Sequence, residues 1–133
     1  MTPVVLDASA ALHILAASTR FADSAPFHAP RLLRSEVLSA LHTQVWRGVL
    51  PRDAAGEMRH RLEELSLSLF ADELQLHERA WSVADELGWA KTYDAEYVAL
   101  AQILEMPLLT ADARLARGAE HLVRIMAPAE FGL

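Results

Sequence analysis

Residues 92–112 read TYDAEYVALAQILEMPLLTAD and contain the local patterns that decide the fold. Apolar residues recur at spacings of three and four in the first half, which predicts a helix over residues 94–104. The run PLLT that follows predicts a buried strand over residues 107–110, and a short helix is expected from about Asp112. A helix that leads into a buried strand and then into another helix is typical of an α/β fold.

The rest of the chain repeats this alternation of short apolar runs and amphipathic stretches. Further strands are predicted over residues 4–6, near Phe27, over 66–70 and over 122–126. Further helices are predicted over residues 7–18, 31–47, 51–65 and 76–87, and Gly48 and Gly88 end two of them. Residues 21–30 read as irregular. We therefore expect one domain over residues 1–133, with a mainly parallel central sheet flanked by helices on both faces.

Composition excludes several classes of protein. The chain has 133 residues, 12 basic and 18 acidic side chains, a formal charge of −6 and no Cys. The charge argues against a protein that coats nucleic acid, and the absence of Cys excludes disulfides, thiolate metal sites and a Cys nucleophile. No apolar run is long enough for a transmembrane helix, and no signal peptide is evident. These features fit a cytoplasmic protein.

Four acidic residues stand out by position. Asp7 and Asp112 follow predicted strands, where sites in parallel sheets lie, and Asp94 begins a helix that packs on the sheet. Glu36 lies at the edge of a core-facing helix stripe, with no Lys or Arg three or four residues away. Each Asp alone is compatible with a helix N-cap. Together, as carboxylates without a structural cation, the four predict a Mg²⁺ or Mn²⁺ site.

Four motifs carry a family resemblance. VVLDASAAL (4–12), RSEVLSAL (34–41), TYDAEYVALA (92–101) and PLLTADARL (107–115) resemble, in this order, the motifs of PIN-domain ribonucleases, and the length points to toxins of the VapC type. The resemblance covers almost the whole chain, except for residues 50–75, and implies a PIN-like fold. It places the acidic positions of the family on Asp7, Glu36, Asp94 and Asp112, and its hydroxyl positions on Ser9 and Thr110.

The resemblance implies a Mg²⁺- or Mn²⁺-dependent endoribonuclease, the toxin of a toxin–antitoxin pair, in which the four acids hold the metal. It also implies an RNA substrate, a VapB-type antitoxin, a cytoplasmic location and a homodimer. Trp46, Val49 and Leu50 could form part of the subunit contact, with burial in the core as the alternative.

Three nearby residues are candidates for orienting water or substrate. Ser9 and Thr110 carry hydroxyl groups beside the acids, and Arg114 suits a phosphate contact. A helix cap for Ser9 and a strand-end hydrogen bond for Thr110 are the structural alternatives.

Other functions fit less well. A phospho-receiver domain needs paired acids after the first strand and a late Lys, and an Asp-nucleophile phosphatase needs an acid where Ser9 stands. The six His form no HxH or HExxH pattern, so a zinc hydrolase is not expected. A non-catalytic PIN-fold module that binds RNA or protein stays open, and metal-dependent cleavage of RNA separates it from the nuclease.

Overall fold

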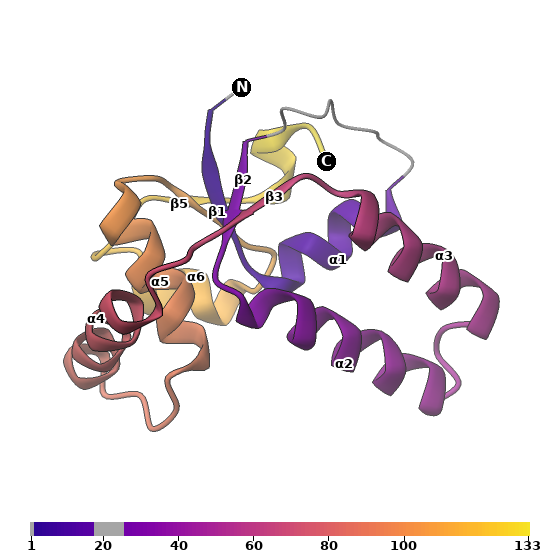
Figure 1. Ribbon diagram of the computed structural model, residues 1–133, viewed down its shortest axis with the longest axis horizontal. Helices are drawn as coiled ribbons and strands as arrows, with labels where there is room; N and C mark the ends of the chain where they lie inside the picture. The colour runs from indigo at the N-terminus through magenta and orange to yellow at the C-terminus, as the bar shows by residue number, and fades with distance from the viewer. Residues whose placement is uncertain (1, 18–25) are drawn as a thin grey trace.

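The computed structural model describes residues 2–17 and 26–133. Within these residues, five strands form one sheet in the order β3-β2-β1-β4-β5, and every neighbouring pair is parallel (Figure 1). The strands are β1 (Val4–Leu6), β2 (Phe27–Ala29), β3 (Leu67–Leu69), β4 (Leu108–Leu109) and β5 (Ile125–Met126). The predicted α/β fold with a parallel central sheet is therefore confirmed.

Helices cover both faces of this sheet. They are α1 (Ala8–Ala16), α2 (Leu32–Trp46), α3 (Arg52–Glu64), α4 (Glu73–Leu87), α5 (Tyr93–Leu104) and α6 (Ala113–Ala119), followed by the 3₁₀ helix η1 (Pro128–Phe131). The first three gather on one side, and α4 and α5 lie with α6 on the other (Figure 1). The chain moves outward from β1 to β3 and then returns past β1 to β4 and β5. Because crossovers between parallel strands are right-handed, this reversal of direction places the two groups of helices on opposite faces of the sheet. None of the described helices has both the length and the apolar character needed to cross a membrane.

The core forms because the central strands are covered on both faces. Val4, Val5 and Leu6 of β1 are completely buried, as are both residues of β4. Burying a side chain of this size stabilises the fold by about 1.5–3 kcal/mol. The run of apolar residues that predicted these strands thus reflects contact with helices on both sides.

Several predicted boundaries are shifted. Helix α4 begins at Glu73, three residues before the predicted start, because Asp72 accepts a hydrogen bond from the backbone N–H of Gln75 at 3.1 Å and caps the helix. Strand β5 is two residues long and shorter than the predicted range of 122–126. Ser18, at the end of the predicted first helix, and residues 21–25 of the predicted irregular segment lie outside the described residues.

The turn between α2 and α3 exposes apolar side chains. Trp46 is 79% exposed and Val49 is 72% exposed, so burial in the core is wrong for both. Leu50 is partly buried and packs against the core. This turn therefore presents an apolar surface outside the hydrophobic core.

The sheet has a topological switch point between β1 and β4. These strands are neighbours, with Val5 opposite Leu108 and Leu6 opposite Leu109, yet the chain leaves them in opposite directions. Connections at such a point diverge and leave space at the carboxyl ends of the strands. Asp7 and residues 110–112 follow directly at this edge.

Gly56→Ala should stabilise the protein. Gly56 lies inside α3, its φ is not positive, and a Cβ added there meets nothing within 4 Å. Alanine is favoured over glycine in a helix interior by about 1 kcal/mol, which corresponds to a rise of about 4 °C in the melting midpoint. Gly118→Ala in α6 is the matched control, because its Cβ would lie 3.0 Å from the Trp89 ring, and it should gain less. Equal gains in thermal melts would contradict this account.

Candidate active site

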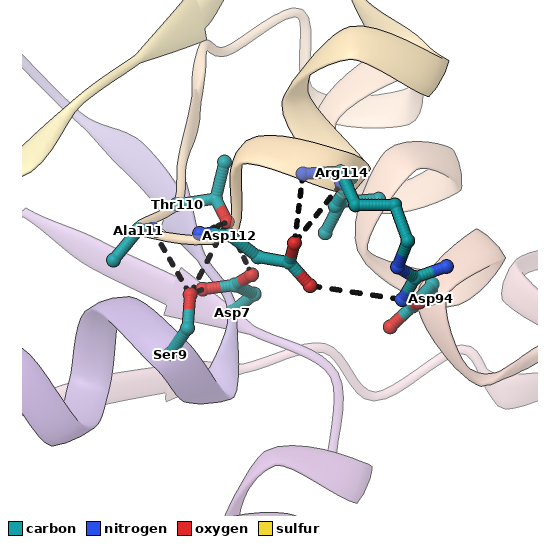
Figure 2. A network of polar contacts seen from close by, with 8 residues as sticks. Asp7, Ser9, Asp94, Thr110, Ala111, Asp112 and Arg114 are labelled. Atoms are coloured by element: carbon teal, nitrogen blue, oxygen red, sulfur yellow. Dashed lines mark hydrogen bonds and ion pairs between the residues drawn. The ribbon is translucent and has the colours of Figure 1, made fainter.

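Asp7 is the centre of a hydrogen-bonded network at the end of β1 (Figure 2). It is 4% exposed and is the N-cap of α1, where its Oδ1 accepts the N–H of Ala10 at 2.9 Å. The Ser9 hydroxyl donates to the same oxygen at 2.7 Å, and the Thr110 hydroxyl donates to Oδ2 at 2.5 Å. Both carboxylate oxygens are thus held by groups from two separate strand ends.

The loop after β4 is tied into this network. The N–H of Ala111 donates to the Ser9 hydroxyl at 2.9 Å, and the N–H of Asp112 donates to the Thr110 hydroxyl at 3.0 Å. The Oδ1 atom of Asp112 accepts the N–H groups of Arg114 and Leu115 at 2.9 and 3.2 Å, so Asp112 is the N-cap of α6. The capping alternative for Asp112 is therefore correct, and it leaves Oδ2 outside the cap.

Asp94 differs from the other two aspartates. It lies in the first turn of α5, and the N-cap residue of this helix is Thr92. The alternative that Asp94 is a helix N-cap is therefore wrong. Its Oδ2 pairs with the Arg114 guanidinium at 3.3 Å, and the same nitrogen lies 3.7 Å from Oδ2 of Asp112 (Figure 2). The expectation of carboxylates without a structural cation is therefore wrong, because a side chain two residues beyond Asp112 reaches back across the site.

Glu36 approaches the site from α2. Its carboxylate accepts a hydrogen bond from the Tyr97 hydroxyl. Burial raises the pKa of Glu36 above its ordinary value, the Tyr97 hydrogen bond lowers it, and the charges of Asp94 and Asp7 raise it further. These effects of charge indicate that Glu36 lies near both aspartates, although it belongs to a helix on the other side of the sheet from α5.

The pKa of Asp7 is also raised. Burial is the main cause, the hydrogen bonds from Thr110, Ala10 and Ser9 oppose it, and the charge of Asp112 adds to it. Together with the Arg114 bridge between Asp94 and Asp112, this links the acids electrostatically. The structure thus brings together the four predicted carboxylates, Asp7, Glu36, Asp94 and Asp112, with Ser9, Thr110 and Arg114.

Sequence reasoning missed two residues of this edge. Tyr97 appeared only as an apolar helix position, and its hydroxyl is the partner of Glu36. The pKa of Glu96 is raised above its ordinary value, mainly by burial and in part by the charge of Glu36. His77, whose Nε2 lies 3.9 Å from Oε1 of Glu96, acts in the opposite direction. The spacing of three residues between Asp94 and Tyr97 could have indicated that Tyr97 lies near the site, since residues at that spacing share one side of a helix.

The donor set suits a hard divalent cation, although it is not gathered around one point. Over residues 2–17 and 26–133, no three acidic or His side chains stand as a ready-made ligand group. Carboxylate and hydroxyl oxygens are nevertheless the ligands that Mg²⁺ and Mn²⁺ prefer. Burial, and in smaller part the neighbouring acids, disfavour the charged forms of Asp7 and Glu36, and a cation would offset this. The residues therefore fit such a cation in chemistry and charge, with Arg114 supplying positive charge to two of them.

Comparison with known proteins shows the family of this chain. A family model described as PIN domain matches residues 4–121. The chain belongs to the PIN-domain family. A relative, "VapC ribonuclease Mb0985" of Mycobacterium bovis, is 34% identical over 119 residues, covering 85% of this chain and 88% of the relative. "Ribonuclease VapC1" of Mycobacterium tuberculosis is 36% identical over 89 residues, covering 67% of this chain and 65% of the relative.

A solved structure supports the PIN fold. The crystal structure of PAE2754 from Pyrobaculum aerophilum matches with a TM-score of 0.79, covering 98% of this chain and 92% of that one. The two sequences are 22% identical. At this sequence identity, the structural similarity is evidence for a shared fold and for nothing more.

Glu36→Gln should stabilise the metal-free protein increasingly as the pH rises. Because the pKa of Glu36 is raised above its ordinary 4.5, ionising Glu36 costs folding free energy above that pH. Gln keeps an oxygen for the Tyr97 hydroxyl and does not ionise, so the difference in melting midpoint should be larger at about pH 8 than at about pH 4. Thermal melts in EDTA measure this, with Glu63→Gln at an exposed position of α3 as the control. A difference that is constant or shrinks with pH would contradict it.

Proposed function

We propose that this protein is a metal-dependent endoribonuclease of the VapC type that hydrolyses RNA phosphodiester bonds. Asp7, Glu36, Asp94 and Asp112 would hold Mg²⁺ or Mn²⁺, and residues 1–133 would form one PIN domain. The observation that carries the proposal is that these four carboxylates, from separate elements, are linked near the switch point of the sheet. Arg114 bridges Asp94 and Asp112, and the charges of the acids affect one another. The relatives named as ribonucleases support it.

The reaction needs an activated water and charge stabilisation at phosphorus. A divalent cation, when bound, supplies Lewis acidity for both. In the metal-free protein, burial raises the pKa values of Asp7 and Glu36, and a bound cation would offset this cost of their charge. The hydroxyls of Ser9 and Thr110 hold Asp7 from two sides and thereby fix its oxygens.

Arg114 would contribute to substrate binding. Its side chain is 73% exposed and pairs with Asp94 and Asp112 in the absence of a metal. A divalent cation at these carboxylates would balance the charge that holds Arg114. The guanidinium would then be available for a bidentate contact with an RNA phosphate.

A second candidate function is a PIN-fold module that binds RNA or protein without cutting it. The Arg114 pairs favour it, because they occupy two of the four acids with a side-chain cation. Metal-dependent cleavage of RNA by the purified protein decides between the two functions.

We also propose the partners that accompany such a toxin. They are a VapB-type antitoxin and a second copy of the chain, in the cytoplasm. The exposed Trp46 and Val49 support a protein contact at the turn between α2 and α3, since large apolar groups in solvent mark interaction sites. The acidic site would attract a basic side chain of the antitoxin.

Asp7→Asn should abolish cleavage and leave the fold intact. Asparagine has the same shape and caps a helix nearly as well, but it is neutral and a poor ligand for Mg²⁺. We expect a loss greater than the roughly 10–100-fold that outer partners of metal sites cost. Cleavage of RNA at saturating Mn²⁺ measures this, and circular dichroism verifies the fold.

Asp72→Asn is the matched control. Asp72 caps α4 through the N–H three residues on, as Asp7 caps α1, and it lies outside the candidate site. Its variant should cleave within about twofold of wild type. Near-wild-type cleavage by Asp7→Asn, or equal losses in both variants, would reject the assignment.

The products should carry 5′-phosphate and 3′-hydroxyl ends. A water activated at the carboxylates attacks phosphorus directly, so the RNA 2′-hydroxyl is not the nucleophile. A 2′-O-methyl group at the cleaved nucleotide should therefore leave the chemistry possible. End-group analysis of a labelled RNA measures this, and 2′,3′-cyclic phosphate ends would overturn the mechanism.

A further inference from the structure

The hydroxyl group of Tyr97 connects the core of α5 to the candidate site. The side chain of Tyr97 is 1% exposed and belongs to the hydrophobic core, and its hydroxyl donates to Oε1 of Glu36 on α2. Tyr97 lies three residues after Asp94, about one helical turn away on the same side of α5. A buried tyrosine hydroxyl requires a partner, and here the partner is a carboxylate of the site.

Glu36 depends on this contact more than Asp7 and Asp112 depend on any single one. Over residues 2–17 and 26–133, the hydroxyl of Tyr97 is the one hydrogen-bond partner of Glu36, and Glu36 forms no ion pair. The Oε2 atom of Glu36 therefore has no polar partner among these residues. Asp7 accepts three hydrogen bonds, and Asp112 accepts two besides its contact with Arg114. Glutamate also loses the most rotamer freedom of the acids when it is fixed in place.

A role in core packing alone does not explain the hydroxyl. Phenylalanine would fill the same volume without a polar group, and burying a hydroxyl costs free energy unless it is hydrogen-bonded. The ring is fixed by the surrounding core, so the hydroxyl offers Glu36 a rigid donor. The contact therefore limits where the carboxylate of Glu36 can lie.

We propose that Tyr97 is a positioning residue, which holds Oε1 of Glu36 and leaves Oε2 for the divalent cation. The inference rests on the proposed function, because it assigns Glu36 to the metal site. It adds to the four carboxylates a neutral residue that touches neither metal nor substrate. Partners of this kind orient metal ligands, and their loss typically weakens metal binding 10–100-fold.

Tyr97→Phe removes only the hydroxyl and tests the inference. The Kd of the metal-free protein for Mn²⁺, measured from the electron paramagnetic resonance signal of free Mn²⁺, should rise about tenfold. Tyr93→Phe is the matched control, since Tyr93 is the other tyrosine of the chain, lies one turn earlier on α5 and is 55% exposed. Its Kd should equal that of wild type. For RNA cleavage, Tyr97→Phe should lower kcat and leave KM unchanged.

A double-mutant comparison separates positioning from packing. In a Glu36→Gln background the hydroxyl has no carboxylate to place, so Tyr97→Phe should not raise the Kd further. A purely structural effect would appear with equal size in both backgrounds. That result, or an unchanged Kd for Tyr97→Phe, overturns the inference. Wild-type protein that binds no Mn²⁺ and cleaves no RNA overturns the proposed function, and the inference with it.

A measurement on the unmutated site covers the case in which Tyr97→Phe does not fold. Labelling Tyr93→Phe protein with 3-fluorotyrosine gives a single fluorine resonance, from Tyr97. Mg²⁺ should shift this resonance when Glu36 is present and leave it in place in the Glu36→Gln variant. A resonance that Mg²⁺ does not move in the presence of Glu36 overturns the inference.

Discussion

The pairing of β1 with β4 is the contact on which the candidate site depends. It sets Leu6 opposite Leu109 and makes two strands that are a hundred residues apart in sequence end at the same edge. The next residues of each chain segment then bond across the gap, with the Ser9 and Thr110 hydroxyls 3.2 Å apart and both on Asp7. Because a strand advances about 3.3 Å per residue, a shift of one residue in this register would separate them.

Repulsion among the acids adds to the cost of burying them. Two carboxylates about 5 Å apart repel by about 3 kcal/mol at an effective dielectric constant near 20. The exposed pair between Arg114 and Asp94 returns only about 0.2–1 kcal/mol. Hydrogen bonds to a charged acceptor contribute about 1.5–3 kcal/mol each, so the donors around Asp7 offset more of the repulsion than Arg114 does. The pKa values of Asp7 and Glu36 stay raised, mainly because both side chains are buried and in smaller part because of the neighbouring acids.

The sequence predicted the parts of the site that depend on local patterns. Asp7 and Asp112 follow buried apolar runs, and a residue after a parallel strand lies at the active edge whatever the details of packing. Glu36 was noticed because it lies beside a core-facing stripe, with no Lys or Arg three or four residues away.

The contacts that depend on tertiary packing could not be predicted in this way. The return of Arg114 to Asp94 joins α6 to α5, and the hydroxyl of Tyr97 joins α5 to α2. The exposure of Trp46 had the same origin, because helix spacing does not say how far a helix extends beyond the sheet. Local sequence patterns do not predict how such separate segments pack against each other.

The four acids are fixed in two different ways, and this explains why they do not converge on one point. Asp7 and Asp112 are helix N-caps, so backbone N–H groups hold them wherever α1 and α6 are folded. The positive ends of these helices also favour their charge. Among the residues that the structure describes, Glu36 and Asp94 are held only by the side chains of Tyr97 and Arg114. A cation would thus meet one preformed pair of ligands and a second pair whose rotamers can still adjust, without any change in the sheet.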